Sequence, residues 1–231
     1  MLLLCVSDVH GNLDALRAVL ATAERRSFHK LLVAGDVVFS GLDDASSAQP
    51  LETWRRLTAA GAMMVQGVTD RAIATLDPTK LAPKSDHEEK MVERMKGVRA
   101  ELGDLVLERL RRLPTQVRLP LEDGGELLLV HGSPVDPSEA MTHDMSDEEL
   151  SALIGDEPAD LIVCGMSHVP FDRVVQGTRI VNVGSVGESP YEVIARAEPM
   201  VAHATWIESR PSGIVVEPIV VPLRERALKT G

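Results

Sequence analysis

Four short segments of this chain place carboxylate and imidazole side chains directly after apolar runs. The side chains are Asp8 and His10, then Asp36, His131 and His168. The apolar runs that precede them cover residues 2–6, 31–34, 127–130 and 161–164. Such runs are typical of buried strands, and the ligand sites of open α/β sheets form where strands end. We therefore expect these side chains to converge on one site.

The side-chain chemistry of these segments favours a transition metal. Asp8 and Asp36 offer carboxylate oxygens, whereas His10 and His168 offer imidazole nitrogens. This mixture suits Mn, Fe or Zn better than Ca, which prefers oxygen alone. Taken singly, an aspartate at a strand end more often caps a helix, and a lone histidine is more often packed or solvated. Taken together and in this order, the four residues predict a divalent metal centre.

The N-terminal part of the chain predicts the elements that position the first two segments. Buried strands are expected at residues 2–7, 30–34 and 62–66, with helices at residues 12–26 and 51–60 between them. Asn12 is expected to cap the first helix. Strands that alternate with helices are typical of a parallel sheet covered on both faces.

The C-terminal part predicts hairpins instead of further strand–helix repeats. Paired strands are expected at residues 115–121 with 126–130, 171–175 with 178–183, and 200–208 with 214–223. Residues 146–149 read Ser-Asp-Glu-Glu, a capping box that opens a helix ending near residue 154. Parallel and hairpin segments in one chain indicate two mixed sheets with helices outside.

A charged segment at residues 77–113 is interpreted as a helical insertion or cap within a single domain of residues 1–231. Its helical spacing is interrupted at Gly97 and Gly103. The plainest interpretation is a solvated helical hairpin. The alternative is a lid or a dimer surface, which leaves a homo-oligomer open.

The composition limits the classes of partner. The chain has 24 basic and 35 acidic residues, a formal net charge of −11, and 3% aromatic residues. A surface of this charge repels polyanions, and stacking platforms for bases are scarce, so we expect no general nucleic-acid binding. The sequence shows neither a signal peptide nor an apolar stretch of membrane-spanning length. We expect a cytoplasmic protein with no membrane partner, and Cys5 and Cys164 as buried thiols.

Six motifs, in order and spacing, resemble those of the calcineurin-like metallophosphoesterases. They are Asp8-Val9-His10-Gly11-Asn12, Gly35-Asp36, Gly67-Val68-Thr69-Asp70, His131-Gly132, Gly165-Met166-Ser167-His168, and Asn182-Val183-Gly184-Ser185-Val186-Gly187. The resemblance implies a four-layer α/β/β/α sandwich with two metals at the strand ends. It also implies hydrolysis of a phosphoester by metal-activated water.

The resemblance assigns the first metal to Asp8, His10, Asp36 and His168, all of which have the family's residue types. It assigns the second metal to Asp36, His131 and two further family ligands. Those two are replaced here by Val68 and Met166. Valine has no lone pair, and the methionine thioether is a poor partner for hard or borderline ions. We therefore expect one divalent Mn, Fe or Zn site and a second site that is impaired.

The resemblance also names residues for catalysis and for substrate binding. Thr69 stands at the family's catalytic histidine, beside Asp36 and His131 as catalytic residues. A threonine donates hydrogen bonds but does not act as an acid near neutral pH. The residues expected at the substrate are Asn12, Gly184, Ser185 and His143, the last either as a solvated side chain or as a new acid.

Two functions follow as hypotheses. The first is a metal-dependent phosphoesterase that acts on a small phosphoester molecule. The alternative is a non-catalytic metal- or phosphate-binding module derived from the same fold, which the replacements at Val68, Thr69 and Met166 motivate.

Overall fold

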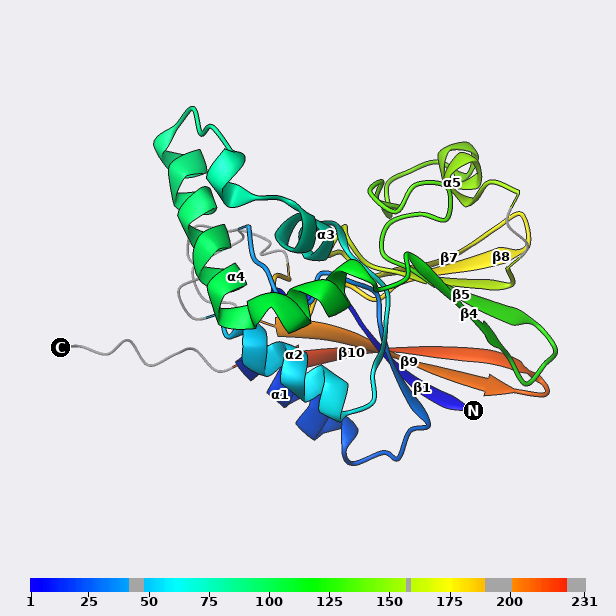
Figure 1. The fold of residues 1–231 in the computed structure, drawn as a ribbon. Coiled ribbons are helices and arrows are strands. Elements are labelled where there is room, and N and C mark those ends of the chain that lie inside the picture. The colour runs from blue at the N-terminus through cyan, green and yellow to red at the C-terminus, as the bar shows by residue number, and fades with distance from the viewer. Residues whose placement is uncertain (42–47, 157–158, 190–200, 224–231) are drawn as a thin grey trace, which may run out of the picture.

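The computed structural model describes residues 1–41, 48–156, 159–189 and 201–223. Two five-stranded mixed sheets pack face to face, and helices cover their outer faces (Figure 1). The helices α1, α2 and α4 lie on one outer side and α5 lies on the other. This arrangement is the four-layer α/β/β/α sandwich expected from the motifs.

The first sheet has the strand order β10-β9-β1-β2-β3. The strands β1 (Leu2–Val6), β2 (Lys30–Val33) and β3 (Met63–Met64) run parallel, as the sequence predicts. The hairpin of β9 (Val201–Arg210) and β10 (Gly213–Pro222) extends the sheet beside β1. Residue 200, the expected start of this hairpin, lies outside the described residues.

The strand predicted at residues 62–66 is shorter in the structure than expected. The backbone N–H of Val65 still donates to the Val33 carbonyl, but that of Gln66 donates to the Pro114 carbonyl instead. The chain therefore leaves the ladder before Gly67 and turns into α3 (Val68–Thr75).

The second sheet has the strand order β4-β5-β6-β8-β7. Its strands are β4 (Gln116–Pro120), β5 (Glu126–Val130), β6 (Leu161–Cys164), β7 (Phe171–Val175) and β8 (Thr178–Asn182). The two predicted hairpins are confirmed, since β4 pairs antiparallel with β5 and β7 with β8. The strands β5, β6 and β8 are parallel, so two of the predicted site segments leave neighbouring strands at the same edge.

Apolar side chains on both faces of β1 explain why this strand reads as one continuous hydrophobic run. Leu3 and Cys5 pack between the two sheets, whereas Leu4 and Val6 pack against the layer of α1 (Leu13–Ala23) and α2 (Pro50–Ala59). Successive side chains of a strand point to opposite faces, and here both faces are covered. Cys5 and Cys164 are free and buried, and burial raises the pKa of each thiol well above its usual value.

The charged segment contains a short 3₁₀ helix, η1 (Pro78–Lys80), and the long helix α4 (Asp86–Arg111). The predicted interruption at Gly97 is wrong, because α4 continues through it. A glycine inside a helix loses only about 1 kcal/mol relative to alanine, which is too little to end a helix that Ser85 caps. The interruption at Gly103 is confirmed, since its φ of 69° bends α4. Within the described residues, no helix has the length and apolar character to cross a membrane.

The helix predicted before residue 154 is α5 (Asp147–Ile154), and its capping box is confirmed. The Ser146 hydroxyl accepts the Glu149 N–H, and the Glu149 carboxylate accepts the Ser146 N–H. Leu150 and Leu153 of α5 pack onto the outer face of the second sheet with Ile162 of β6. This layer supports the strands from which His131 and His168 emerge.

Candidate metal centre

The candidate ligands sit in loops whose backbone is forced into an uncommon conformation. Of the six described residues other than glycine that have positive φ, five lie in these loops: Asp8 (53°), His10 (50°), Asp36 (52°), Met166 (67°) and His168 (61°). Such angles are rare for side chains with a Cβ atom, and strained backbone of this kind clusters at functional sites. The sheet packing thus holds four of the predicted ligands in strained turns.

Glycines allow neighbouring loops to approach these turns. A Cβ atom on Gly67 would lie 2.1 Å from Oδ1 of Asp36, and one on Gly165 would lie 2.5 Å from Oδ2 of Asp8. A Cβ on Gly35 would lie 2.6 Å from Nδ1 of His131. Each of these three glycines therefore makes room for a candidate ligand.

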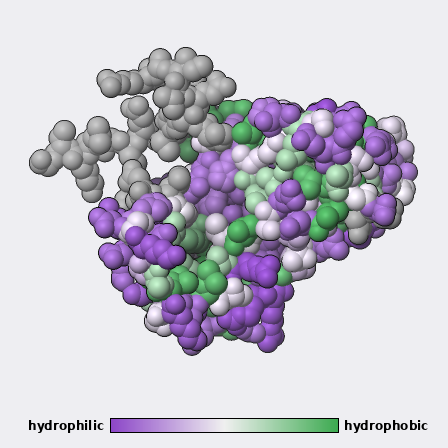
Figure 2. Space-filling view, turned by 90° about the horizontal axis from the view of Figure 1, so that it is seen from above, coloured by the Kyte–Doolittle hydropathy of each residue, from purple (hydrophilic) through white to green (hydrophobic). Residues whose placement is uncertain are grey.

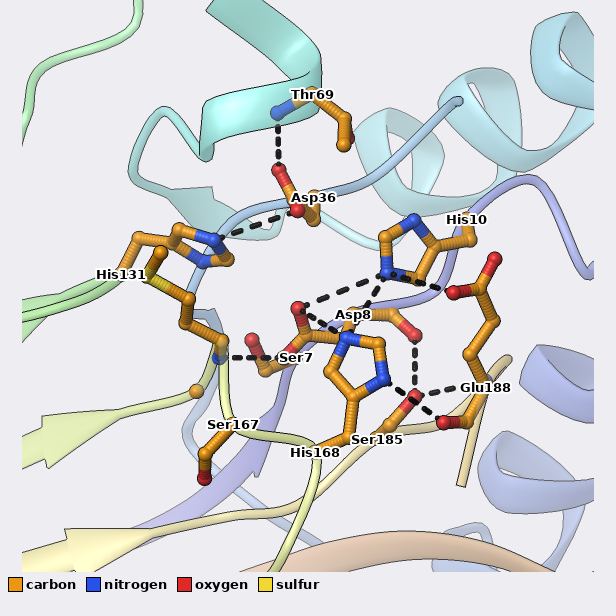
Figure 3. Close-up of polar contacts among 12 residues, drawn as sticks. Ser7, Asp8, His10, Asp36, Thr69, His131, Ser167, His168, Ser185 and Glu188 are labelled. Atoms are coloured by element: carbon orange, nitrogen blue, oxygen red, sulfur yellow. Dashed lines mark hydrogen bonds and ion pairs between the residues drawn. The ribbon is translucent and has the colours of Figure 1, made fainter. Parts of the chain in front are cut away.

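Asp8, His10 and His168 form the first cluster, whose ligand atoms lie within 4.8 Å of one another (Figure 3). Oδ1 of Asp8 lies 3.3 Å from Nε2 of His168 and 3.7 Å from Nε2 of His10. The two Nε2 atoms are 3.3 Å apart. These separations suit three ligands that share one ion with bonds of about 2.0–2.2 Å.

The hydrogen bonds of the two rings fix which nitrogen faces the cluster. Nδ1 of His10 lies 2.7 Å from the Phe39 carbonyl, and Nδ1 of His168 lies 2.9 Å from the Glu188 carbonyl. A carbonyl oxygen only accepts, so each Nδ1 must be the donor. Each neutral ring then turns an Nε2 lone pair toward Asp8, which is the arrangement of histidines that bind metals.

Asp8, Asp36 and His131 form a second cluster on the other side of Asp8 (Figure 3). Nε2 of His131 lies 3.4 Å from Oδ2 of Asp36, and Nδ1 of His131 donates to the Ala34 carbonyl at 2.6 Å. Burial alone would lower the pKa of His131, but the negative charge of Asp36 beside it raises this pKa to about 9. Burial alone would raise the pKa of Asp36, whereas His131 holds it well below the usual range.

The residues present fit a divalent cation. Asp8 is fully buried, and within the described part of the chain no hydrogen-bond donor reaches its Oδ1 while the two neighbouring imidazoles are neutral. A buried acceptor without a donor is costly, and a cation would satisfy it. The donor set of carboxylates and imidazoles is also that of Mn, Fe and Zn sites.

The predicted first-metal set is divided in this structure. Asp36 groups with Asp8 and His131, whereas His10 and His168 group with Asp8 alone. Asp8 is therefore common to both clusters.

The replaced family residues act here through their backbones. The N–H of Thr69 donates to Oδ1 of Asp36 at 2.8 Å, and that of Met166 donates to Oδ2 of Asp8 at 3.0 Å. Both bonds orient a carboxylate toward the centre without adding a ligand atom. Val68 is 38% exposed at the start of α3 and offers no donor or acceptor in its side chain.

The predicted substrate residues lie in different environments. Asn12 caps α1 and its amide donates to the Gly187 carbonyl. Gly184 and Ser185 are buried, and the Ser185 hydroxyl donates to the Asp8 carbonyl at 2.9 Å. His143 is exposed in the loop before α5. The turn of residues 184–187 is thus tied directly to the Asp8 loop through Ser185, and Asn12 is tied to it through the bond of its N–H to the Val9 carbonyl.

Some residues that surround the clusters were not anticipated from the sequence. The Ser7 hydroxyl donates to the Ala34 carbonyl and joins the ends of β1 and β2. Asp70 caps α3 by accepting the Gly67 N–H, and it also accepts the Val37 N–H beside Asp36. Burial, with the nearby charge of Asp36, raises the pKa of Asp70 to about 6.

Glu188 is the unanticipated residue that lies nearest the first cluster. Its Oε2 lies 3.6 Å from Nε2 of His10, and its other oxygen accepts the Ser40 hydroxyl. The sequence feature that could have indicated Glu188 is its place directly after Gly187 in the glycine-rich turn. Gly35-Asp36 has the same glycine–carboxylate pattern.

The face of the molecule seen from above contains a hydrophilic hollow between two parts that carry hydrophobic patches (Figure 2). A polar hollow between apolar margins is typical of a site that binds a charged group on an organic molecule.

The chain belongs to the calcineurin-like phosphoesterase superfamily, because the model of that domain matches residues 1–199. No curated protein matches the chain.

Solved structures resemble the whole fold. A hypothetical protein from Pyrococcus horikoshii OT3 has a TM-score of 0.74 at 19% identity, covering 97% of this chain and 89% of its own. A metallophosphoesterase from Sphaerobacter thermophilus has a TM-score of 0.67 at 21% identity, covering 95% and 88%. Yfce, a phosphoesterase from E. coli, has a TM-score of 0.53 at 20% identity, covering 96% and 100%. At these identities the likeness establishes the fold.

Proposed function

We propose that this protein is a metal-dependent phosphoesterase that hydrolyses a small phosphoester. The observation that carries the proposal is the buried, unpaired Oδ1 of Asp8, with two imidazoles on one side of it and Asp36 with His131 on the other. Acceptors without donors need a cation, and the family to which the chain belongs is one of phosphoesterases.

The residues divide into two roles in this proposal. Asp8, His10 and His168 hold the principal ion, for which Mn²⁺ is our first candidate. A bound divalent ion would polarise a phosphoryl oxygen and lower the pKa of water. Asp36 and His131 form a weaker position that gains ligands when a substrate phosphate is present.

The leaving group defines the substrate class in this proposal. Thr69 stands where a catalytic acid would be, and its hydroxyl only donates a hydrogen bond. Loss of a general acid forfeits roughly 10²–10⁴-fold in rate, except where the leaving group is already good. We therefore infer a preference for phosphoesters with weakly basic leaving groups. The alternative, in which His143 acts as a new acid instead of being a solvated side chain, concerns a residue that is exposed in the loop before α5. Replacement of His143 would then lower kcat most for poor leaving groups.

We also propose that residues 77–113 are an insertion within the domain. In this proposal, its helix α4 supports α3, which carries Thr69. The helix α4 packs along α3, whose first turn contains Thr69. Arg99 and Arg111 of α4 donate to the carbonyls of Ile73 and Ala74 in α3. The position of α3, and through it the Thr69 bond to Asp36, thus depends on α4.

The test is turnover of an activated aryl phosphodiester by full-length protein with added Mn²⁺. Wild-type protein should turn over and Asp36→Ala should not. A preparation of Asp36→Ala that retains full activity would show that the activity belongs to a contaminant. Glu139→Gln, an exposed carboxylate in the loop after β5, serves as the matched control.

The second candidate function is a non-catalytic module that binds one ion or a phosphate group. Val68 and Met166 favour it, because neither has the nitrogen or oxygen atom that a second ligand of this type would need. Elemental analysis separates the two functions. One tightly held ion without turnover of any of a panel of mono- and diesters favours the module, and turnover favours the enzyme.

A further inference from the structure

Glu188 touches the first cluster with both its backbone and its side chain. Its carbonyl accepts the Nδ1–H of His168 at 2.9 Å, which orients that ring. Its carboxylate Oε2 lies 3.6 Å from Nε2 of His10, and the side chain is 13% exposed. Glu188 thus contacts His168 through its backbone and His10 through its carboxylate (Figure 3).

The approach of the Glu188 carboxylate to His10 is favourable when a positive charge lies on the ring, as a proton, or between the two groups, as an ion. Nδ1 of His10 donates to the Phe39 carbonyl, so Nε2 of the neutral ring presents a lone pair. A carboxylate oxygen and a nitrogen lone pair at this distance repel each other. An ion between them would turn the contact into two bonds, as it would for Oδ1 of Asp8 and Nε2 of His168.

The Glu188 carboxylate is held in this place by the loop that follows β2. The Ser40 hydroxyl donates to Oε1 of Glu188, which leaves Oε2 on the side of His10. The backbone N–H of Glu188 donates to the Ser185 hydroxyl at 2.7 Å, and that hydroxyl donates to the Asp8 carbonyl. Glu188 is therefore connected to Asp8 through one side chain and to the Asp36 loop through another.

We propose that Glu188 is a further carboxylate ligand of the ion that Asp8, His10 and His168 hold, with Ser40 as its positioning residue. The proposal rests on the proposed function only in requiring an ion at the first cluster. Two carboxylates and two neutral imidazoles balance the charge of one divalent ion. The added ligand strengthens the first position in a chain whose second position lacks two ligands, at Val68 and Met166.

The experiment measures Mn²⁺ affinity, not activity. Chelator-treated full-length protein is titrated with Mn²⁺, and free Mn²⁺ is followed by its EPR signal. Glu188→Ala and the isosteric Glu188→Gln should each weaken binding by at least about tenfold, the size of loss that even the partners of metal ligands produce. Both variants retain the backbone carbonyl that orients His168. Glu139→Gln is the control and should bind as the wild type does.

A second readout reports ligation itself. Co²⁺ bound to the wild type should show a visible absorption spectrum that changes in Glu188→Ala, because loss of a ligand alters the coordination number. Ser40→Ala should weaken Mn²⁺ binding less than Glu188→Ala, since it keeps the carboxylate and removes only the hydrogen bond that positions it. Circular dichroism of the metal-free variants checks that each is folded.

The outcomes separate the two proposals. If the wild type binds Mn²⁺ and folded Glu188→Ala has the same affinity and the same Co²⁺ spectrum, Glu188 is not a ligand. The phosphoesterase proposal then still stands. A wild type that binds neither ion overturns both. Weaker binding with an altered Co²⁺ spectrum supports Glu188 as a ligand.

Discussion

Nε2 of His10 and Nε2 of His168 lie 3.3 Å apart, and both rings donate through Nδ1 to carbonyls of other segments. In the neutral form of both rings, which is the form that binds a metal, the two Nε2 lone pairs face each other at this distance and have no favourable interaction of their own. The fold nevertheless holds them there, since each carbonyl anchor comes from a loop fixed by the sheets. The short distance between the two Nε2 atoms is explained if both bind the same metal ion.

The first prediction concerns His168→Ala. Excess Mn²⁺ should raise the melting temperature of the wild type, because an ion at 100 times its Kd stabilises the fold by about 2.7 kcal/mol. His168→Ala should show at most a small part of this rise, measured by differential scanning calorimetry. His87→Ala, an exposed histidine of α4, should retain the whole rise. An undiminished rise in His168→Ala would contradict the first cluster as the principal site.

The second prediction concerns pH and His131. With a pKa of about 9, His131 carries a proton at pH 7 in the metal-free protein. A metal ligand must be unprotonated, so an ion that engages His131 releases this proton, and its affinity rises with pH until about 9. Calorimetry in buffers of different ionisation enthalpy measures the proton release, which His131→Asn should reduce. Equal proton release in the two proteins would show that the ion does not engage His131.

The ion pair of His131 and Asp36 also makes the stability of the metal-free protein depend on pH. Because the pKa of His131 in the folded protein lies above the ordinary value of 6.5, protonated His131 stabilises the fold fully below pH 6.5, and this stabilisation is lost as pH rises through about 9.

The third prediction concerns the position of Asp36 and His131, which we propose to be the weaker of the two. Val68→Asn with Met166→His should increase the Mn²⁺ stoichiometry, because it adds an amide oxygen and an imidazole beside Asp36 and His131. Val68 is exposed and Met166 is half-buried, so both changes have room. Histidine also tolerates the φ of 67° at residue 166 better than methionine does. Equilibrium dialysis with elemental analysis measures the stoichiometry, and a value unchanged from the wild type would contradict the prediction.

The fourth prediction compares two glycines. Gly67→Ala would place a Cβ atom 2.1 Å from Oδ1 of Asp36, so the loop must move, at a cost of roughly 1–3 kcal/mol in unfolding free energy and with weaker metal binding. Gly97→Ala is the matched control, because no atom lies within 4 Å of its added Cβ in the helix α4. It should stabilise the protein by about 0.5–1 kcal/mol. Urea unfolding of both variants measures the difference, and equal effects would contradict the role given to Gly67.

The positions of the strands along the chain and the residues at their ends could be predicted from the sequence because burial dictates both. The strand β1 is apolar at every position and can only be an interior strand, so Asp8 and His10 had to emerge at its end. The grouping of these ends was less predictable. Asp36 pairs with His131, not with His10 and His168, because Gly67 lets the α3 loop approach and the Thr69 N–H orients the Asp36 carboxylate.

Glu188 could not be placed from sequence spacing alone. Its position depends on the turn of residues 184–187, in which Gly184 has a φ of 70° and Ser185 bonds to the Asp8 carbonyl. A turn formed by hydrogen bonds between residues 177 positions apart has no periodic signal. The continuity of α4 through Gly97 was missed for a related reason, since the packing of α4 on α3 outweighs local propensity.

Asp8 and His10 leave the first sheet, and His131 and His168 leave the second. An ion shared by Asp8 and His168 would consequently act as a cross-link between the two halves of the sandwich. Its removal should loosen the seam between the sheets before it affects either sheet alone. Hydrogen exchange of the loops at residues 7–11 and 165–168 would register that loosening first, while the amides within β1 and β6 stay protected.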